Sequence, residues 1–239
     1  MTAIAVVRAD DVPADRPADG VQVRTLLEVG PASQRFVRRL VEVAPRSPHH
    51  ATAGPAGELW FVLGGAGQLE VQDQPALTLQ PDRALWLPPG ARYLLDAAEP
   101  GALRIDAVSL PAVTTSPGGP EPCARDLADC EVETTGDRQF RVLFGPGRGC
   151  SAATQFAGEI PPGKAPHHSH PYDEVVLVLA GTGVLHLDDG HHDLSAGSCA
   201  HLPPGQLHCL ENTGTTTMRV LGVFHPADSP AAKSHIDQA

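Results

Sequence analysis

Two stretches of this chain repeat each other, and this repeat restricts the fold more than any other feature of the sequence. Residues 58–71, ELWFVLGGAGQLEV, align with residues 174–187, EVVLVLAGTGVLHL, at an offset of 116 and with six identities in fourteen positions. Further along, WLPPGARY at 86–93 aligns with HLPPGQLH at 201–208 at an offset of 115. A chance repeat would not keep its register over this length, so the sequence predicts two copies of one domain.

The repeated unit is rich in β-strand patterns. Glycine and proline, 24 of each, interrupt the chain at short intervals, and the runs between them alternate or are continuously apolar, as in EVVLVLA and GVLHLD. Short strands between turn signals are typical of all-β sandwiches and barrels. Helical periodicity is weak, and its best candidate is ARDLADC at 124–130. We therefore expect an all-β protein.

The repeat also gives the expected domain boundaries. We expect an N-terminal barrel over 1–112, a linker over 113–130, a C-terminal barrel over 131–225 and a flexible tail over 226–239. The first half of the linker is rich in Pro, Gly, Ser and Thr, which favours an irregular connection. The tail is polar and without periodicity, which is typical of a loose extension or of an arm on a neighbouring subunit.

The charge of the chain argues against several classes of protein. Asp and Glu number 28 against 17 Lys and Arg, a net charge of −11, without a basic stripe. This balance disfavours nucleic acid and anionic membranes as partners. No signal-peptide pattern opens the sequence and no run approaches 18 apolar residues, so no transmembrane helix is expected. The five cysteines form no CxxC pair, which indicates free thiols and a cytoplasmic protein.

A group of histidines in the second half indicates a metal site. His168 and His170 are two residues apart, so on a strand their side chains leave the same face, and Glu174 has the same parity. One strand edge can therefore offer two imidazoles and a carboxylate to one point. This donor set suits Fe(II), Mn(II), Ni(II), Cu(II) or Zn(II). His208, which follows a Pro-Pro-Gly turn, supplies a fourth donor.

These residues resemble the two sequence motifs of the cupin superfamily. The first motif is matched, with its first spacer one residue short of the usual form, by Gly163, His168, His170, Glu174 and Gly181. The second motif is matched at every spacing by Gly197, Pro203, Gly205, His208 and Asn212. The resemblance implies two tandem cupin barrels of the double-stranded β-helix, or jelly-roll, type. It also implies one divalent transition metal in the second barrel, bound by His168, His170, Glu174 and His208.

The first half keeps the frame of the motifs and loses most of the ligands. Aligned by register, the residues that stand in place of the four donors are His50, Thr52, Glu58 and Tyr93. Two donors out of four rarely hold a divalent cation. The chain thus resembles a bicupin with one working metal site, and the first barrel is expected to serve structure or dimer formation.

Other residues are candidates for the surroundings of the metal. The parity of Glu174 and His208 predicts an apolar lining of Val176, Val178 and Leu210, which suits a substrate with an apolar body. Tyr172 and Gln155 are candidates for hydrogen bonds to the ligands. The arginines upstream of the motifs could reach the barrel mouth, although solvated side chains are the simpler expectation: Arg138, Arg141 and Arg148.

Three imidazoles and a carboxylate leave one or two positions of an octahedral ion open to water, substrate or O2. The leading hypothesis is a dioxygenase-type oxidoreductase acting on a chelating enolic, phenolic or 2-oxo-acid metabolite, with Fe(II) or Mn(II) as the favoured ion. A redox-neutral isomerase, cyclase or decarboxylase is the first alternative, and a non-catalytic small-molecule-binding cupin is the second. The motifs do not separate these functions.

The residues that perform the catalytic chemistry are unknown from the sequence. Glu174, Tyr172 and His186 are the candidates, because they lie on or beside the predicted metal strand. A homodimer is expected, since a protein with exposed sheet edges has edges to cover.

Overall fold

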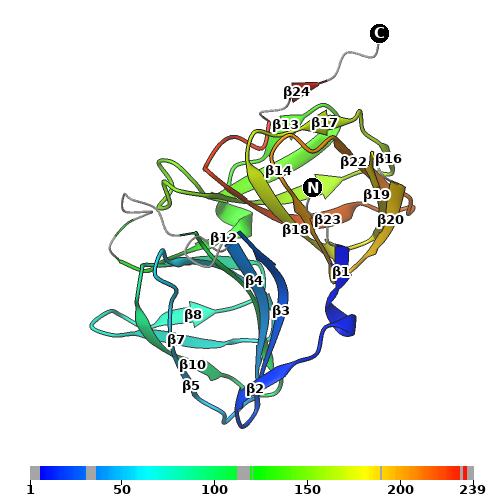
Figure 1. The fold of residues 1–239 in the computed structure, drawn as a ribbon. Helices are drawn as coiled ribbons and strands as arrows, with labels where there is room; N and C mark the ends of the chain where they lie inside the picture. The colour runs from blue at the N-terminus through cyan, green and yellow to red at the C-terminus, as the bar shows by residue number, and fades with distance from the viewer. Residues whose placement is uncertain are drawn as a thin grey trace.

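The computed structural model describes residues 6–30, 36–111, 119, 121–188, 190–231 and 234–235. Within these ranges the chain consists of strands and turns, with short 3-10 helices at Ala9–Asp11 and Leu127–Asp129. Neither helix of this part of the chain has the length and apolar character to cross a membrane. The five cysteines are free thiols, as expected. The protein is all-β and forms two barrels, one above the other in Figure 1.

The first barrel, the lower one in Figure 1, is built from two sheets. Its strands are β2 (Asp15–Ala18), β3 (Val21–Val29), β4 (Phe36–Val43), β5 (His49–Thr52), β6 (Glu58–Gly64), β7 (Gly67–Val71), β8 (Leu77–Leu79), β9 (Arg83–Leu87), β10 (Arg92–Ala97), β11 (Leu103–Ser109) and β12 (Cys123–Asp126). The larger sheet has the order β12-β9-β6-β11-β4-β3-β2, and the smaller has the order β5-β10-β7-β8.

The second barrel repeats this arrangement. Its strands are β1 (Val6–Arg8), β13 (Glu133–Thr135), β14 (Arg138–Phe144), β15 (Thr154–Ile160), β16 (Gly163–Lys164), β17 (His168–Ser169), β18 (Asp173–Ala180), β19 (Thr182–Leu187), β20 (Gly190–Ser195), β21 (Ser198–Leu202), β22 (His208–Asn212), β23 (Met218–His225) and β24 (Ser234–His235). The larger sheet has the order β1-β21-β18-β23-β15-β14-β13, which matches the first barrel strand for strand. The smaller sheet has the order β20-β19-β22-β17-β24, with β16 also paired to β22.

Glycines shared by the two repeats stand where a side chain would not fit. Gly65 and Gly181 occupy equivalent turns with φ of 75° and 91°, a region that favours glycine. Two residues later, a Cβ on Gly67 would lie 2.3 Å from the carbonyl oxygen of Asp96, and a Cβ on Gly183 would lie 2.3 Å from that of Glu211. Close approach of two backbones therefore explains why these glycines recur at the repeat offset.

Short strands cross the expected domain boundaries. β1, at the start of the chain, pairs with β21 of the second barrel. Residues 124–130, the best helical candidate, contribute instead to β12, which pairs with β9, and to a 3-10 turn. Of the expected linker and tail, residues 113–118, 120, 232–233 and 236–239 lie outside the described residues. The described part of the tail includes β24, whose backbone pairs with β17.

The two larger sheets pack face to face, and this packing explains the continuous apolar runs in the sequence. In β6, Leu59 and Phe61 point into the core between the barrels, while Trp60 and Val62 point into the first barrel. In β18, Val175 and Leu177 join the core between the barrels, and Val176 and Val178 face the interior of the second. Strands buried on both faces need apolar residues at every position.

A fully buried ion pair lies in the core between the barrels. Arg38 of β4 donates from Nε and Nη2 to the two carboxylate oxygens of Asp106 on β11, at 2.7 and 3.0 Å. The same guanidinium donates to the carbonyl oxygens of Val175, at 2.9 Å, and Leu221, at 3.1 Å, in the second barrel. Both side chains are 0% exposed. The charge of Arg38 is thus satisfied by both barrels at once.

Removal of this guanidinium is expected to destabilise the protein strongly. Arg38→Met leaves the Asp106 carboxylate buried without its partner, a change that costs about 3–5 kcal/mol. The double variant Arg38→Met/Asp106→Leu should recover most of that loss, because no unpaired charge remains. The free energy of unfolding in urea measures both effects.

Arg83→Met is the matched control, because Arg83 makes a similar two-point contact with Asp126 in a pair whose side chains are 21% and 28% exposed. Its loss is expected to cost at most about 1 kcal/mol. Equal destabilisation by Arg38→Met and Arg83→Met would contradict the role assigned to the buried pair.

Candidate metal centre

Three buried histidines meet inside the second barrel. His168 on β17 lies directly opposite His208 on β22 in an antiparallel pair, and His170 follows two residues after His168. One ring nitrogen from each of the three lies within 4.8 Å of the other two. The three side chains are 2–7% exposed. We call His168, His170 and His208 the three-histidine cluster.

Hydrogen bonds to the backbone determine which ring nitrogen of His168 and of His208 points into the cluster. Nδ1 of His168 lies 3.2 Å from the carbonyl oxygen of Pro166, and Nδ1 of His208 lies 2.9 Å from that of Gln206. A carbonyl oxygen only accepts hydrogen bonds, so Nδ1 of each ring donates to it. Nε2 of both rings therefore carries the lone pair, which is the state that a metal ligand needs.

Tyr172 holds the third ring. Its hydroxyl lies 3.0 Å from Nδ1 of His170, and the two rings stack with their centroids 4.8 Å apart. The ring of Phe224 also stacks on that of Tyr172, with their centroids 4.2 Å apart. Burial, and next the charge of Glu174, raise the pKa of the Tyr172 phenol, so it stays neutral. A neutral hydroxyl can accept the Nδ1 proton of His170, which leaves Nε2 for a metal. Tyr172 is thus a positioning residue.

Glu174, the fourth predicted ligand, lies beside the cluster. It begins the inward-facing row of β18, is 6% exposed, and places Oε2 at 3.5 Å from Nε2 of His170. Glu174 does not belong to the three-histidine cluster, whose ligand atoms all lie within 4.8 Å of one another. The structure thus brings together three of the four predicted donors, and the role of Glu174 as a ligand stays a prediction.

The cluster opens on a small cavity of about 70 Å³. Val176 and Leu210 line it, as their parity predicts, whereas Val178 is buried in the barrel core without reaching it. Arg138 also lines the cavity and donates from Nη2 to the carbonyl oxygen of Leu210 at 2.5 Å. The lining residues that the sequence analysis did not identify include Thr135, Gln139, Phe156, Phe224 and Pro230.

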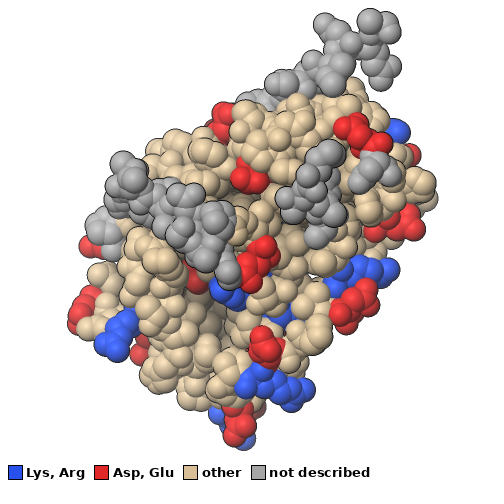
Figure 2. All heavy atoms as spheres, viewed as in Figure 1, with Lys and Arg blue, Asp and Glu red and all other residues tan. Residues whose placement is uncertain are grey.

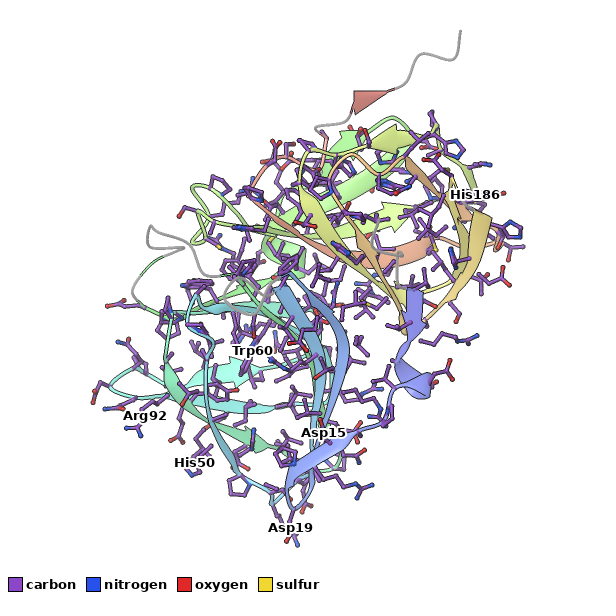
Figure 3. All side chains as sticks on the ribbon, in the orientation of Figure 1. Asp15, Asp19, His50, Trp60, Arg92 and His186 are labelled. Carbon is purple, nitrogen blue, oxygen red and sulfur yellow. The ribbon has the colours of Figure 1, made fainter. Side chains whose placement is uncertain are left out.

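Four other candidates lie away from this cavity. His186, labelled in Figure 3, is on the outer face of β19, because its neighbour Leu187 is the residue that lies opposite His208. Its Nε2 pairs with Glu211 at 2.6 Å. Gln155 instead donates to the carbonyl oxygen of Trp60 at 3.4 Å, across the boundary between the barrels. Arg141 and Arg148 contact the carboxylates of Glu159 and Glu133.

The first barrel has a different set of residues at the equivalent place. Tyr93 lies opposite Ala51, so His49 shares its inward face and His50 faces outward. The alignment by register had placed His50 inward. Tyr93 pairs with Ala51 and not with His50, one residue away from that alignment, and a shift of one residue turns a side chain to the other face of a sheet. Among the described residues, metal-type clusters of three or more donors are confined to the second barrel.

Comparisons with known proteins agree with the two-barrel β-fold. The cupin domain family matches residues 157–224. A protein described as glyoxylate-induced from Pseudomonas aeruginosa has a similar fold, with a TM-score of 0.77 and 18% identity over 100% of this chain and 93% of that one. A variant of oxalate decarboxylase from Bacillus subtilis gives a TM-score of 0.77 with 14% identity, over 99% of this chain and 80% of that one.

Two further proteins are similar to this chain. The protein YlbA from E. coli has a TM-score of 0.73 and 14% identity, over 95% of this chain and 92% of that one. An uncharacterized protein from Methanocaldococcus jannaschii is 27% identical over 60 residues, which is 25% of this chain and 48% of that protein's length. At these identities the solved structures establish the fold alone.

The three-histidine cluster predicts a specific pattern of metal loss. His168→Ala and His208→Ala should each remove the stoichiometric metal, measured by mass spectrometry of the purified protein. Tyr172→Phe removes only the partner of His170, and should weaken metal affinity by about 10–100-fold.

His186→Ala is the matched control, because His186 lies on the same barrel and outside the cluster. It should keep the full metal content. Metal retained by His208→Ala, or lost equally by His186→Ala, would contradict the site.

Proposed function

Because residues 157–224 form a cupin domain within a two-barrel cupin fold, we propose that this protein is a metal-dependent enzyme acting on a small organic metabolite. The observation that supports this proposal best is the three-histidine cluster, in which backbone carbonyls accept from Nδ1 of His168 and His208. Buried imidazoles held in the tautomer of a metal ligand are expected of a metal site.

The residues present fit one divalent transition ion per chain. His168, His170 and His208 would hold it, and Glu174 would complete the donor set. Imidazole and carboxylate donors accept Fe(II), Mn(II), Ni(II), Cu(II) and Zn(II). We favour Fe(II) or Mn(II) because the proposed reaction uses O2. When bound, such an ion supplies Lewis acidity towards an oxygen donor of the substrate and, as Fe(II) or Mn(II), reactivity towards O2.

The other residues of the cavity indicate the substrate class. Val176, Leu210 and Phe156 provide apolar walls that exclude water and fit a hydrocarbon body. Arg138 provides a cation at the same cavity, and its guanidinium has donors beyond the one that contacts Leu210. A planar guanidinium matches a carboxylate in two-point contact. Among enolic, phenolic and oxo-acid metabolites, this arrangement favours a 2-oxo acid or its enol.

The proposed reaction is of the dioxygenase type, with O2 as the second substrate. A redox-neutral decarboxylation or isomerisation of the same substrate is the second candidate. The small volume of the cavity favours this candidate, because a reaction without O2 needs room for one substrate only. In either reaction Tyr172 holds the His170 ring and Arg138 orients the substrate carboxylate towards the cluster.

Turnover of a panel of small 2-oxo acids and phenols, with and without O2, tests the proposal and separates its two forms. Dioxygenation requires O2 uptake equal to substrate loss, while a decarboxylase or isomerase consumes substrate equally well under nitrogen. Arg138→Gln should raise KM for a 2-oxo acid by about tenfold or more, because a charge-assisted contact is lost.

His208→Ala should abolish turnover of any active substrate, and His186→Ala should leave it unchanged. Stoichiometric metal combined with no turnover of any compound in the panel would count against an enzyme of this class, and would favour a binding protein instead.

A further inference from the structure

The first barrel contains a cavity that the metal centre does not use. Its volume is about 430 Å³, against about 70 Å³ for the cavity beside the three-histidine cluster. It lies inside the barrel and is lined by residues of β3, β4, β5, β6, β10 and β11. A volume of several hundred Å³ is in the range of small-molecule sites, about 300–1,000 Å³. Its polar lining residues are Arg39, His49, Thr52, Glu58, Tyr93 and Ser109.

A chain of hydrogen bonds fixes a guanidinium at the wall of this cavity. Nη1 of Arg39 donates to Oγ of Ser109 at 2.9 Å, and Ser109 donates to Oε1 of Glu58 at 2.8 Å. Glu58 also accepts from Nε1 of Trp60, at 2.8 Å, and from the backbone N–H of Gly54, at 3.1 Å. The residue that replaces Glu174 in this barrel therefore receives three hydrogen bonds from the protein and serves to hold Arg39 and Trp60 in place.

The remaining donors of Arg39 are available to a ligand. A guanidinium has five N–H donors, and the contact with Ser109 uses Nη1 alone among the described hydrogen bonds of this side chain. Burial, and next the charge of Glu58, raise the pKa of the Tyr93 phenol, so it is a neutral hydroxyl. Burial, and next His50, lower the pKa of His49, which favours its neutral imidazole. The cavity thus offers one cation with neutral donors near it, and the oxygens of its carboxylate, Glu58, already accept three hydrogen bonds from the protein.

The rest of the cavity wall is apolar. Val23, Val41, Ile105 and Leu95 line it together with the ring of Trp60, which is 2% exposed and packs edge-on against Tyr93 at 5.0 Å. Figure 3 shows Trp60 within the lower barrel, and His50 and Arg92 on its outer side. An apolar chamber with one fixed cation at its wall is complementary to a molecule that has a hydrocarbon body and one anionic end.

We propose that the first barrel binds a small organic carboxylate with an apolar body, and that Arg39 pairs with the carboxylate while Trp60 and the aliphatic residues contact the body. The donors in this cavity, one imidazole and one carboxylate already engaged by three N–H or O–H groups, do not make a metal site. The protein therefore has two chemically different sites, and this one does not rest on the function proposed for the metal centre.

Tryptophan fluorescence can report on this site alone. The chain has two tryptophans, Trp60 and Trp86, and Trp86 is buried in the core between the barrels. In full-length Trp86→Phe protein the emission comes from Trp60. Titration with 4-methylpentanoate and with phenylacetate should change this emission saturably. The corresponding amides, 4-methylpentanamide and phenylacetamide, should bind at least about tenfold more weakly, because they lack the charge.

Variants in the same background test the role of each part of the cavity. Arg39→Met should weaken binding of the acids by about tenfold or more, and Arg39→Lys should recover part of it. Ala107→Phe fills the cavity and keeps Arg39, so it should also prevent binding. Arg92→Met, an exposed arginine on the outer side of the same barrel, should bind as the parent does.

Three results would overturn the proposal. The first is the absence of a saturable change with either acid up to millimolar concentration, and the second is equal affinity for acids and amides. The third is unchanged binding by both Arg39→Met and Ala107→Phe. The His208→Ala variant separates the two barrels: it should bind the acids normally in this assay even though it has lost its metal. Loss of the Trp60 signal in that variant would place the carboxylate in the second barrel and also refute the proposal.

Discussion

The burial of one positive charge between two apolar sheets constrains this protein more than any other interaction. A charge in that position is tolerated only if it is paired with an opposite charge and hydrogen-bonded to fixed acceptors. Arg38 finds two acceptors on Asp106 in its own barrel and two backbone carbonyls in the other barrel. One of those carbonyls belongs to Val175, the residue after Glu174. The strand that supplies a predicted metal ligand is therefore held in register from the neighbouring barrel.

Much of the architecture follows from local patterns in the sequence. Continuous apolar runs such as ELWFVLG arise because β6 and β18 are buried on both faces, with alternate residues assigned to two different cores. The glycines at the repeat offset follow from turns and close backbone contacts. The spacing of His168 and His170 places both on one side of the chain. These features depend on neighbours within a few residues, so periodicity and spacing are sufficient to predict them.

The features that the sequence did not predict depend on distant pairing. Residues 124–130 were the best helical candidate because nothing local reveals that β9 offers them an edge. Aligning the two halves puts His50 in place of His168, because nothing local shows that Tyr93 pairs with Ala51 instead. Arg138 reaches the metal cavity through its position on β14, and His186 faces away from it because of the pairing of β19 with β22. An error of one residue in the pairing register of a strand assigns its side chains to the wrong face of the sheet, even when the strand itself is predicted correctly. Figure 2 shows acidic and basic side chains interspersed over one face of the molecule, in agreement with a sequence that has no basic stripe.

Each barrel has an edge strand that lies outside its own repeat in the sequence: β1 pairs with β21 of the second barrel, and β12 pairs with β9 of the first. This arrangement affects how the chain folds during synthesis and whether the two barrels can be separated. β1 precedes its partner β21 by most of the described chain, so β1 stays unpaired until β21 has been synthesised. Closing so long a loop is slow compared with forming the hairpins inside each barrel. If the gene were divided between the barrels, β1 would be on the N-terminal fragment, separated from its partner β21. The edge of β21 would then be exposed to intermolecular association. The two barrels, although they have the same architecture, are therefore not independently folding domains that could be separated in protein engineering.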